Sequence, residues 1–129
     1  MRAPGLHRRL LLMTCLAAAC GGSDSPVDPG PTPPSNPNRI VISQSGVSPV
    51  ELVVAPGTRV LFVNNDTRRH LVTSDPHPEH DDCTALAQVG ALQPGQSRES
   101  GNLVALGPCA FHDDDSPGNA VFSGAIVVR

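Results

Sequence analysis

The chain has 129 residues, with 9 basic and 12 acidic side chains and a formal net charge of −3 at pH 7. This length allows a single domain, and the acidic balance argues against nucleic acid as a partner, because nucleic-acid binding relies on basic patches. The sequence contains no tryptophan and no tyrosine, and no serine–histidine–aspartate arrangement stands out. We therefore do not expect an enzyme.

Residues 1–19 are predicted to be an export signal, because arginines near the start precede a short apolar stretch. The stretch is too short to cross a bilayer as a permanent helix. It closes on the letters LAAAC, which resemble the lipobox of bacterial lipoproteins, and this resemblance implies that Cys20 is lipidated. The alternative is an ordinary signal that is cleaved to give a free product. We expect a protein of the bacterial cell envelope that touches the membrane only through its lipid and faces the periplasm or the exterior.

Residues 20–37 are predicted to be a disordered tether, since prolines and small polar residues dominate them and little can be buried. Removal of residues 1–19 would leave six arginines against twelve acids, a net charge of −6. It would also leave Cys83 and Cys109 as the unmodified cysteines, in a compartment that permits disulfides.

Residues 38–129 are predicted to form one all-β domain, a small sandwich, because short runs rich in β-branched residues alternate with turn signals. The clearest strands are RIVIS, VELVV, RVLFVN, HLVTS and GAIVVR, at 39–43, 50–54, 59–64, 70–74 and 124–129. Pro56 and Gly57 favour a tight turn and so predict a hairpin between the second and third of these strands. The segment 75–90 is a long polar loop, which in so small a domain is usually functional or tied down.

Histidines and cysteines are the residues of this domain that could carry chemistry. The domain has four histidines, His70, His77, His80 and His112, and the last of these follows Cys109 by three positions. Residues at the ends of separate strands can converge at one pole of a sandwich. One cysteine thiolate with two imidazoles is a ligand set that suits copper, which makes His70, Cys109 and His112 the leading candidates.

The order of these features resembles the cupredoxins, the plastocyanin and amicyanin family. The family's hairpin, asparagine-containing loop and first histidine ligand resemble ELVVAPGTRVLFVNNDTRRHLVTS. Its proline–glycine turn resembles LQPGQS, and its ligand loop and closing strand resemble CAFH and FSGAIVV. The resemblance implies a Greek-key β-sandwich or barrel, one copper ion held by His70, Cys109 and His112, and electron transfer as a monomer to a redox partner. The family's axial methionine has no counterpart, because Phe122 stands at that position.

Two alternatives remain open. A disulfide between Cys83 and Cys109 would remove the thiolate, and His77 or His80 with His70 and His112 could then form an all-nitrogen copper or zinc site. Such a module would capture copper or deliver it to a copper-handling protein. The three aspartates after His112 would make the same pole strongly negative. The other alternative is a structural or adhesive sandwich without a metal.

Overall fold

The computed structural model describes residues 36–129. The predicted signal, Cys20 and residues 20–35 of the predicted tether lie outside the described residues. Within residues 36–129 no helix is long and apolar enough to cross a membrane.

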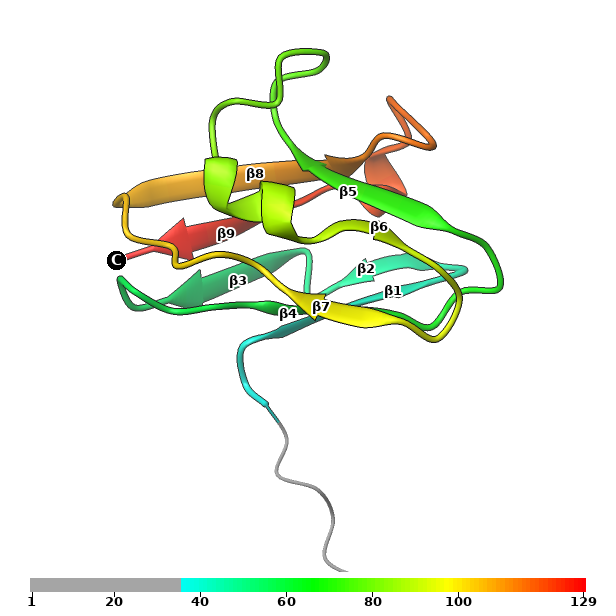
Figure 1. Ribbon diagram of the computed structural model, residues 1–129, viewed down its shortest axis with the longest axis horizontal. Helices are drawn as coiled ribbons and strands as arrows, with labels where there is room; N and C mark the ends of the chain where they lie inside the picture. The colour runs from blue at the N-terminus through cyan, green and yellow to red at the C-terminus, as the bar shows by residue number, and fades with distance from the viewer. Residues whose placement is uncertain (1–35) are drawn as a thin grey trace, which may run out of the picture. The chain divides into compact units, whose positions relative to one another are not determined.

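The domain consists of two mixed β-sheets (Figure 1). The first has the strand order β2-β1-β4-β7 and the second the order β3-β9-β8-β5-β6. The strands of the first sheet are β1 (Arg39–Ser43), β2 (Gly46–Ser48), β4 (Leu61–Asn64) and β7 (Ser97–Glu99). Those of the second are β3 (Glu51–Val54), β5 (His70–Ser74), β6 (Gly90–Leu92), β8 (Gly107–Asp113) and β9 (Gly124–Val128). Two short 3-10 helices, η1 (Thr84–Gln88) and η2 (Ala120–Phe122), complete the described chain, so the predicted all-β sandwich is confirmed.

The core lies between the two sheets. Alternate side chains of β1 point into it, so Ile40 and Ile42 are almost fully buried, as is Ile126 of β9. Phe62 of the first sheet meets Phe111 of the second edge to face, with ring centroids 5.2 Å apart. Full burial of each of these side chains contributes about 1.5–3 kcal/mol, and this contact identifies the inner face of β8 as the one that carries Phe111.

The predicted hairpin between residues 50–54 and 59–64 is wrong, although its turn is present. The amide of Thr58 donates to the carbonyl of Ala55 over 3.2 Å, and Gly57 has the positive φ of 85° that the turn requires. The flanking strands nevertheless enter different sheets: β3 pairs in parallel with β9, and β4 pairs in parallel with β1. Turn residues specify a local reversal of the chain, whereas strand pairing is decided by which partner completes each buried face.

The loop 75–83 follows β5 and projects beyond the second sheet between β5 and η1 (Figure 1, light green). The amide of Asp75 donates to the carbonyl of Ala110 over 3.1 Å, which holds the start of the loop against β8. The predicted loop 75–90 is thus shorter than expected: residues 84–88 form η1, because Leu86 is fully buried in the core. The remaining loop, 75–83, lies beside the strand that carries Cys109 and His112.

Candidate metal centre

The register between β5 and β8 decides which candidate residues can meet. Thr73 lies opposite His112, and Val72 lies opposite Asp113. Directly opposed residues of an antiparallel pair share a face, and successive residues of a strand alternate between faces. His70, two residues from Val72, therefore shares the inner face with Cys109, while His112 points outward.

His70 is fully buried between two carboxylates. Its Nδ1 lies 2.8 Å from Asp113 Oδ2 and its Nε2 lies 3.0 Å from Asp66 Oδ2. Both ring nitrogens of His70 are therefore occupied by carboxylate oxygens at hydrogen-bond distance. Neither nitrogen is free to bind a metal in this structure.

Asp66 is the second buried member of this group. Burial raises the pKa of its carboxyl, but hydrogen bonds from His70, the Thr67 amide and Arg68 outweigh that effect and hold the pKa below its usual value of 3.8. The carboxylate of Asp66 is therefore favoured in the folded state.

We expect Asp66 to contribute to acid unfolding. A depressed folded-state pKa gives stability that is fully present above the unfolded value of 3.8 and is lost as pH falls through the lower folded value. Urea unfolding between pH 5 and pH 2 should therefore show a fall in the free energy of unfolding that is shallower in Asp66→Asn. Glu79→Gln, at an exposed loop position, is the control, and an unchanged acid slope in Asp66→Asn would contradict the assignment.

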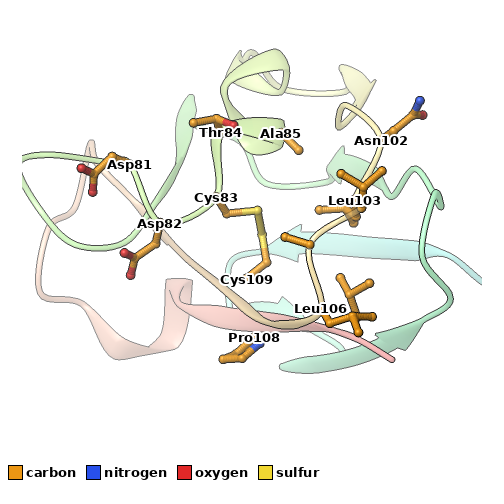
Figure 2. Close-up of a pocket in the computed structure, with 13 residues that line it drawn as sticks. Asp81, Asp82, Cys83, Thr84, Ala85, Asn102, Leu103, Leu106, Pro108 and Cys109 are labelled. Carbon is orange, nitrogen blue, oxygen red and sulfur yellow. A yellow bond between two sulfur atoms is a disulfide. The ribbon is translucent and has the colours of Figure 1, made fainter.

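Cys109 is joined to Cys83 by a disulfide, with Cα atoms 5.4 Å apart. The bond connects β8 to the end of the loop 75–83, as Figure 2 shows. This is one of the two states that the sequence left open for Cys109. A disulfide sulfur is not a thiolate, so Cys109 offers no copper ligand in this state.

The predicted ligand set of His70, Cys109 and His112 does not converge in this structure. His112 lies on the opposite face of the sheet from the other two, and His70 and Cys109 are already bonded to other groups. Phe122, which was expected at the family's axial-methionine position, is buried with its ring centroid 4.9 Å from that of His70. The guanidinium of Arg68 lies 4.8 Å from the centre of the same ring.

A different cluster forms on the outer face. His77 and His80 of the loop, His112 of β8 and Asp114 just after it each offer one ligand atom, and these atoms all lie within 4.8 Å of one another. The imidazole centroids are 5.2–5.7 Å apart. The loop covers His112, whose side chain is only 9% exposed, whereas His77 is half exposed. Two of the three histidines in this cluster thus come from the loop that the sequence predicted to be functional or tied down.

Hydrogen bonds orient two of these imidazoles. Nδ1 of His112 lies 2.5 Å from Asp75 Oδ1, and Nδ1 of His80 lies 2.9 Å from the carbonyl oxygen of Ser74. A carbonyl and an ionised carboxylate only accept, so both rings carry their proton on Nδ1. Their Nε2 atoms point toward Asp114, at 3.7 Å and 3.6 Å from its Oδ1. Fixing one ring nitrogen by an outer acceptor is the usual arrangement of metal-binding histidines.

Asp114 supplies the negative charge at the centre of the cluster. Its Oδ1 is buried and has no hydrogen-bond partner: Nδ1 of His77 lies 2.8 Å away, but not in hydrogen-bonding geometry. A buried carboxylate oxygen without a donor is costly. A cation bound among the three imidazoles would satisfy it.

The backbone of His80 is in the left-handed region, with φ of 57°, which is uncommon for a residue other than glycine. This conformation allows its ring to reach back to Ser74 at the end of β5.

The aspartates after His112 do not form the uniformly negative pole expected from the sequence. Asp113 is buried against His70, and Asp115 accepts two 2.7 Å hydrogen bonds from Arg69. Of the three, only Asp114 faces the histidine cluster. Sequence reasoning missed the roles of Asp66, Asp113 and Asp114, and the alternation of side chains along β8 was the signal that could have separated the last two.

Comparison with solved structures places this arrangement in a known fold. The chain is similar to a purple cupredoxin from Nitrosopumilus maritimus, with a TM-score of 0.54, 19% identity and coverage of 70% of this chain and 98% of that one. The fold is that of a cupredoxin. Plastocyanin from Dryopteris crassirhizoma matches with a TM-score of 0.54 and 16% identity over 70% and 99% of the two chains. A Cu(I) form of an amicyanin variant matches with a TM-score of 0.52 and 20% identity over 70% and 80%.

No protein-family model matches the chain, and no curated protein matches its sequence. The identities of 16–20% to the solved structures establish the cupredoxin fold. Function has to be argued from the residues of this chain.

Proposed function

We propose that this protein binds one copper ion through His77, His80, His112 and Asp114 and acts in copper capture or delivery. The observation that carries the proposal is the convergence of three imidazoles on a buried carboxylate oxygen that accepts no hydrogen bond. Three imidazoles and one carboxylate suit a transition-metal ion, and Nδ1 of His80 and of His112 is already hydrogen bonded away from the site.

The chemistry of the donors supports copper. Nitrogen and oxygen sites bind Cu(II) more tightly than the other common divalent first-row metals, following the Irving–Williams order. The fold adds support, because a solved structure with the same fold is an amicyanin in its Cu(I) form. A cluster of imidazoles would hold the ion in place, and Asp114 would balance part of its charge.

Capture or delivery is favoured over electron transfer through a thiolate-bound copper. The latter needs a free sulfur at Cys109, which the disulfide with Cys83 occupies. The half-exposed His77 lies at the edge of the cluster. A copper-handling protein could reach a bound ion there.

The cellular setting belongs to the same proposal. An extracytoplasmic position with a lipid anchor at Cys20 is supported by the signal-like stretch and the LAAAC letters of the sequence. That compartment also suits a disulfide-bonded protein.

Calorimetric titration with Cu(II) tests the proposed site. The oxidised protein should bind one ion, and Asp114→Asn should bind it about ten to a hundred times more weakly. The asparagine keeps the shape of the side chain but removes the charge that faces the imidazoles.

Glu79→Gln is the matched control, because it removes one negative charge from the same loop at an exposed position outside the cluster. Its affinity for Cu(II) should equal that of the unchanged protein. Equal losses in the two variants would indicate general charge attraction in place of coordination, and absence of Cu(II) binding to the oxidised protein would refute the proposal.

A further inference from the structure

We propose that the Cys83–Cys109 disulfide controls the metal affinity of the histidine cluster, so that a dithiol reductant which opens the bond weakens the site. This inference rests on the proposed copper site. It assigns the disulfide a regulatory role in addition to its structural one.

The position of the disulfide carries the inference. Cys83 follows His80 by three residues, and Cys109 precedes His112 by three residues. The bond therefore joins the loop that carries two ligands to the strand that carries the third. Opening it removes the covalent link nearest to the cluster.

The other restraints on the loop are non-covalent. The amide of His80 donates to the carbonyl of Pro76, the amide of Asp82 donates to the carbonyl of Asp75, and the ring of His80 reaches the carbonyl of Ser74. These contacts hold the loop to itself and to the end of β5. The amide of Asp75 also donates to the carbonyl of Ala110 in β8, and Nδ1 of His77 lies 2.8 Å from Asp114 Oδ1. The disulfide adds the covalent link between the far end of the loop and β8.

The bond borders a cavity through which we expect a reductant to approach. A cavity of about 210 Å³ is lined by both cysteines, by Leu103 and Leu106, and by Asp82 on the loop side (Figure 2). Cys109 itself is only 4% exposed, whereas Cys83 is half-buried. Cys83 is therefore the sulfur that an incoming thiolate would attack.

The exchange balances with one dithiol. A thiolate of the reductant attacks the Cys83 sulfur, the sulfur–sulfur bond breaks, and Cys109 leaves as the thiolate. The second thiol of the reductant then closes its own disulfide and frees Cys83. Two electrons pass from the reductant to the protein, which ends as a dithiol whose loop is held by its backbone and by non-covalent contacts.

The expected consequence is weaker metal binding. A looser loop must be ordered when the ion binds, and that cost reduces affinity. Loss of groups that orient metal ligands typically lowers affinity about ten- to a hundredfold. We expect a decrease of that size for the protein without the bond.

The test compares Cu(II) affinity of the oxidised protein with that of Cys83→Ser/Cys109→Ser, in which no reductant is needed. Ile42→Ala, a core change in the other sheet, is the control for general destabilisation. Circular dichroism establishes that each variant is folded during the titration. The serine pair should bind about ten to a hundred times more weakly, and Ile42→Ala should bind as the unchanged protein does.

The outcomes separate the two proposals. Equal Cu(II) affinity of the serine pair and the oxidised protein would overturn the redox control and leave the copper site standing. Failure of the oxidised protein to bind Cu(II) would overturn both. An equal loss in Ile42→Ala would also overturn the redox control, because general destabilisation would then account for the effect.

A second measurement uses the unchanged protein and so does not depend on the folding of the serine pair. In graded glutathione buffers, saturating free Zn(II) should shift the thiol–disulfide equilibrium of the protein toward the disulfide. The factor should equal the ratio of Zn(II) affinities, measured by titration, of the oxidised protein and the serine pair, because coupling is reciprocal. Alkylation of free thiols followed by mass measurement gives the reduced fraction. No shift, or a shift toward the dithiol form, would overturn the inference.

Discussion

Replacing His70 by leucine is expected to lower the free energy of unfolding by about 3–5 kcal/mol. His70 is fully buried, and its two ring nitrogens lie within 3.0 Å of the carboxylates of Asp66 and Asp113. Without the imidazole, two buried carboxylates face each other with their main partner gone. Urea unfolding at pH 7, followed by far-ultraviolet circular dichroism, measures the loss.

His77→Leu is the matched control, since the His77 side chain is 50% exposed and lies outside the core. Its free energy of unfolding should change by less than about 0.5 kcal/mol. The fraction of His70→Leu that remains folded should still bind Cu(II) with unchanged affinity. A stability loss below about 1 kcal/mol, the size of an ordinary hydrogen bond, would contradict the role of His70 as the shared partner of the two buried carboxylates.

Replacing His112 by alanine is expected to lower Cu(II) affinity by at least about a hundredfold, beyond the range for groups that merely orient ligands. His112 is the least exposed histidine of the cluster, and Asp75 holds its Nδ1 so that its Nε2 faces Asp114. The site loses a ligand that is already oriented. Calorimetric titration of the oxidised, folded variant with Cu(II) gives the affinity.

Thr73→Val is the control for this variant. The hydroxyl of Thr73 lies 3.2 Å from Nε2 of His112, so it competes with a metal for the same nitrogen. Valine keeps the shape and removes that competition, and the affinity for Cu(II) should stay equal or rise. If His112→Ala bound Cu(II) as well as Thr73→Val does, the ion would have to lie elsewhere.

The strand segments could be predicted from the sequence because they depend on local chemistry, and the cupredoxin fold because the order of the motifs resembles that family. β-Branched runs such as RIVIS and HLVTS became β1 and β5 with the expected bounds. The Pro56–Gly57 turn also formed, but the hairpin expected around it did not, since β3 and β4 each found a parallel partner far away in the sequence. Local signals do not encode that choice of partner.

The candidate site could be predicted only in part. The sequence identified the polar loop with His77 and His80, the histidine at position 112, and both possible states of Cys109. It did not separate the two faces of the sheet, because His112 and Cys109 were interpreted as members of one ligand loop. In the structure β8 continues through Asp113, and a strand alternates its side chains, so residues three apart point to opposite faces.

By itself, the sequence determined the β-rich character of the domain, its turns, and the set of side chains available for a metal. Only the tertiary structure decided which of those side chains point into the core and which point to the outer face of the second sheet. The register of β5 against β8 sends His70 inward to two buried carboxylates and His112 outward to the loop histidines. The disulfide takes Cys109 out of the ligand set. Both outcomes depend on contacts between residues distant in the chain, and those contacts form only when the two sheets close on their common core.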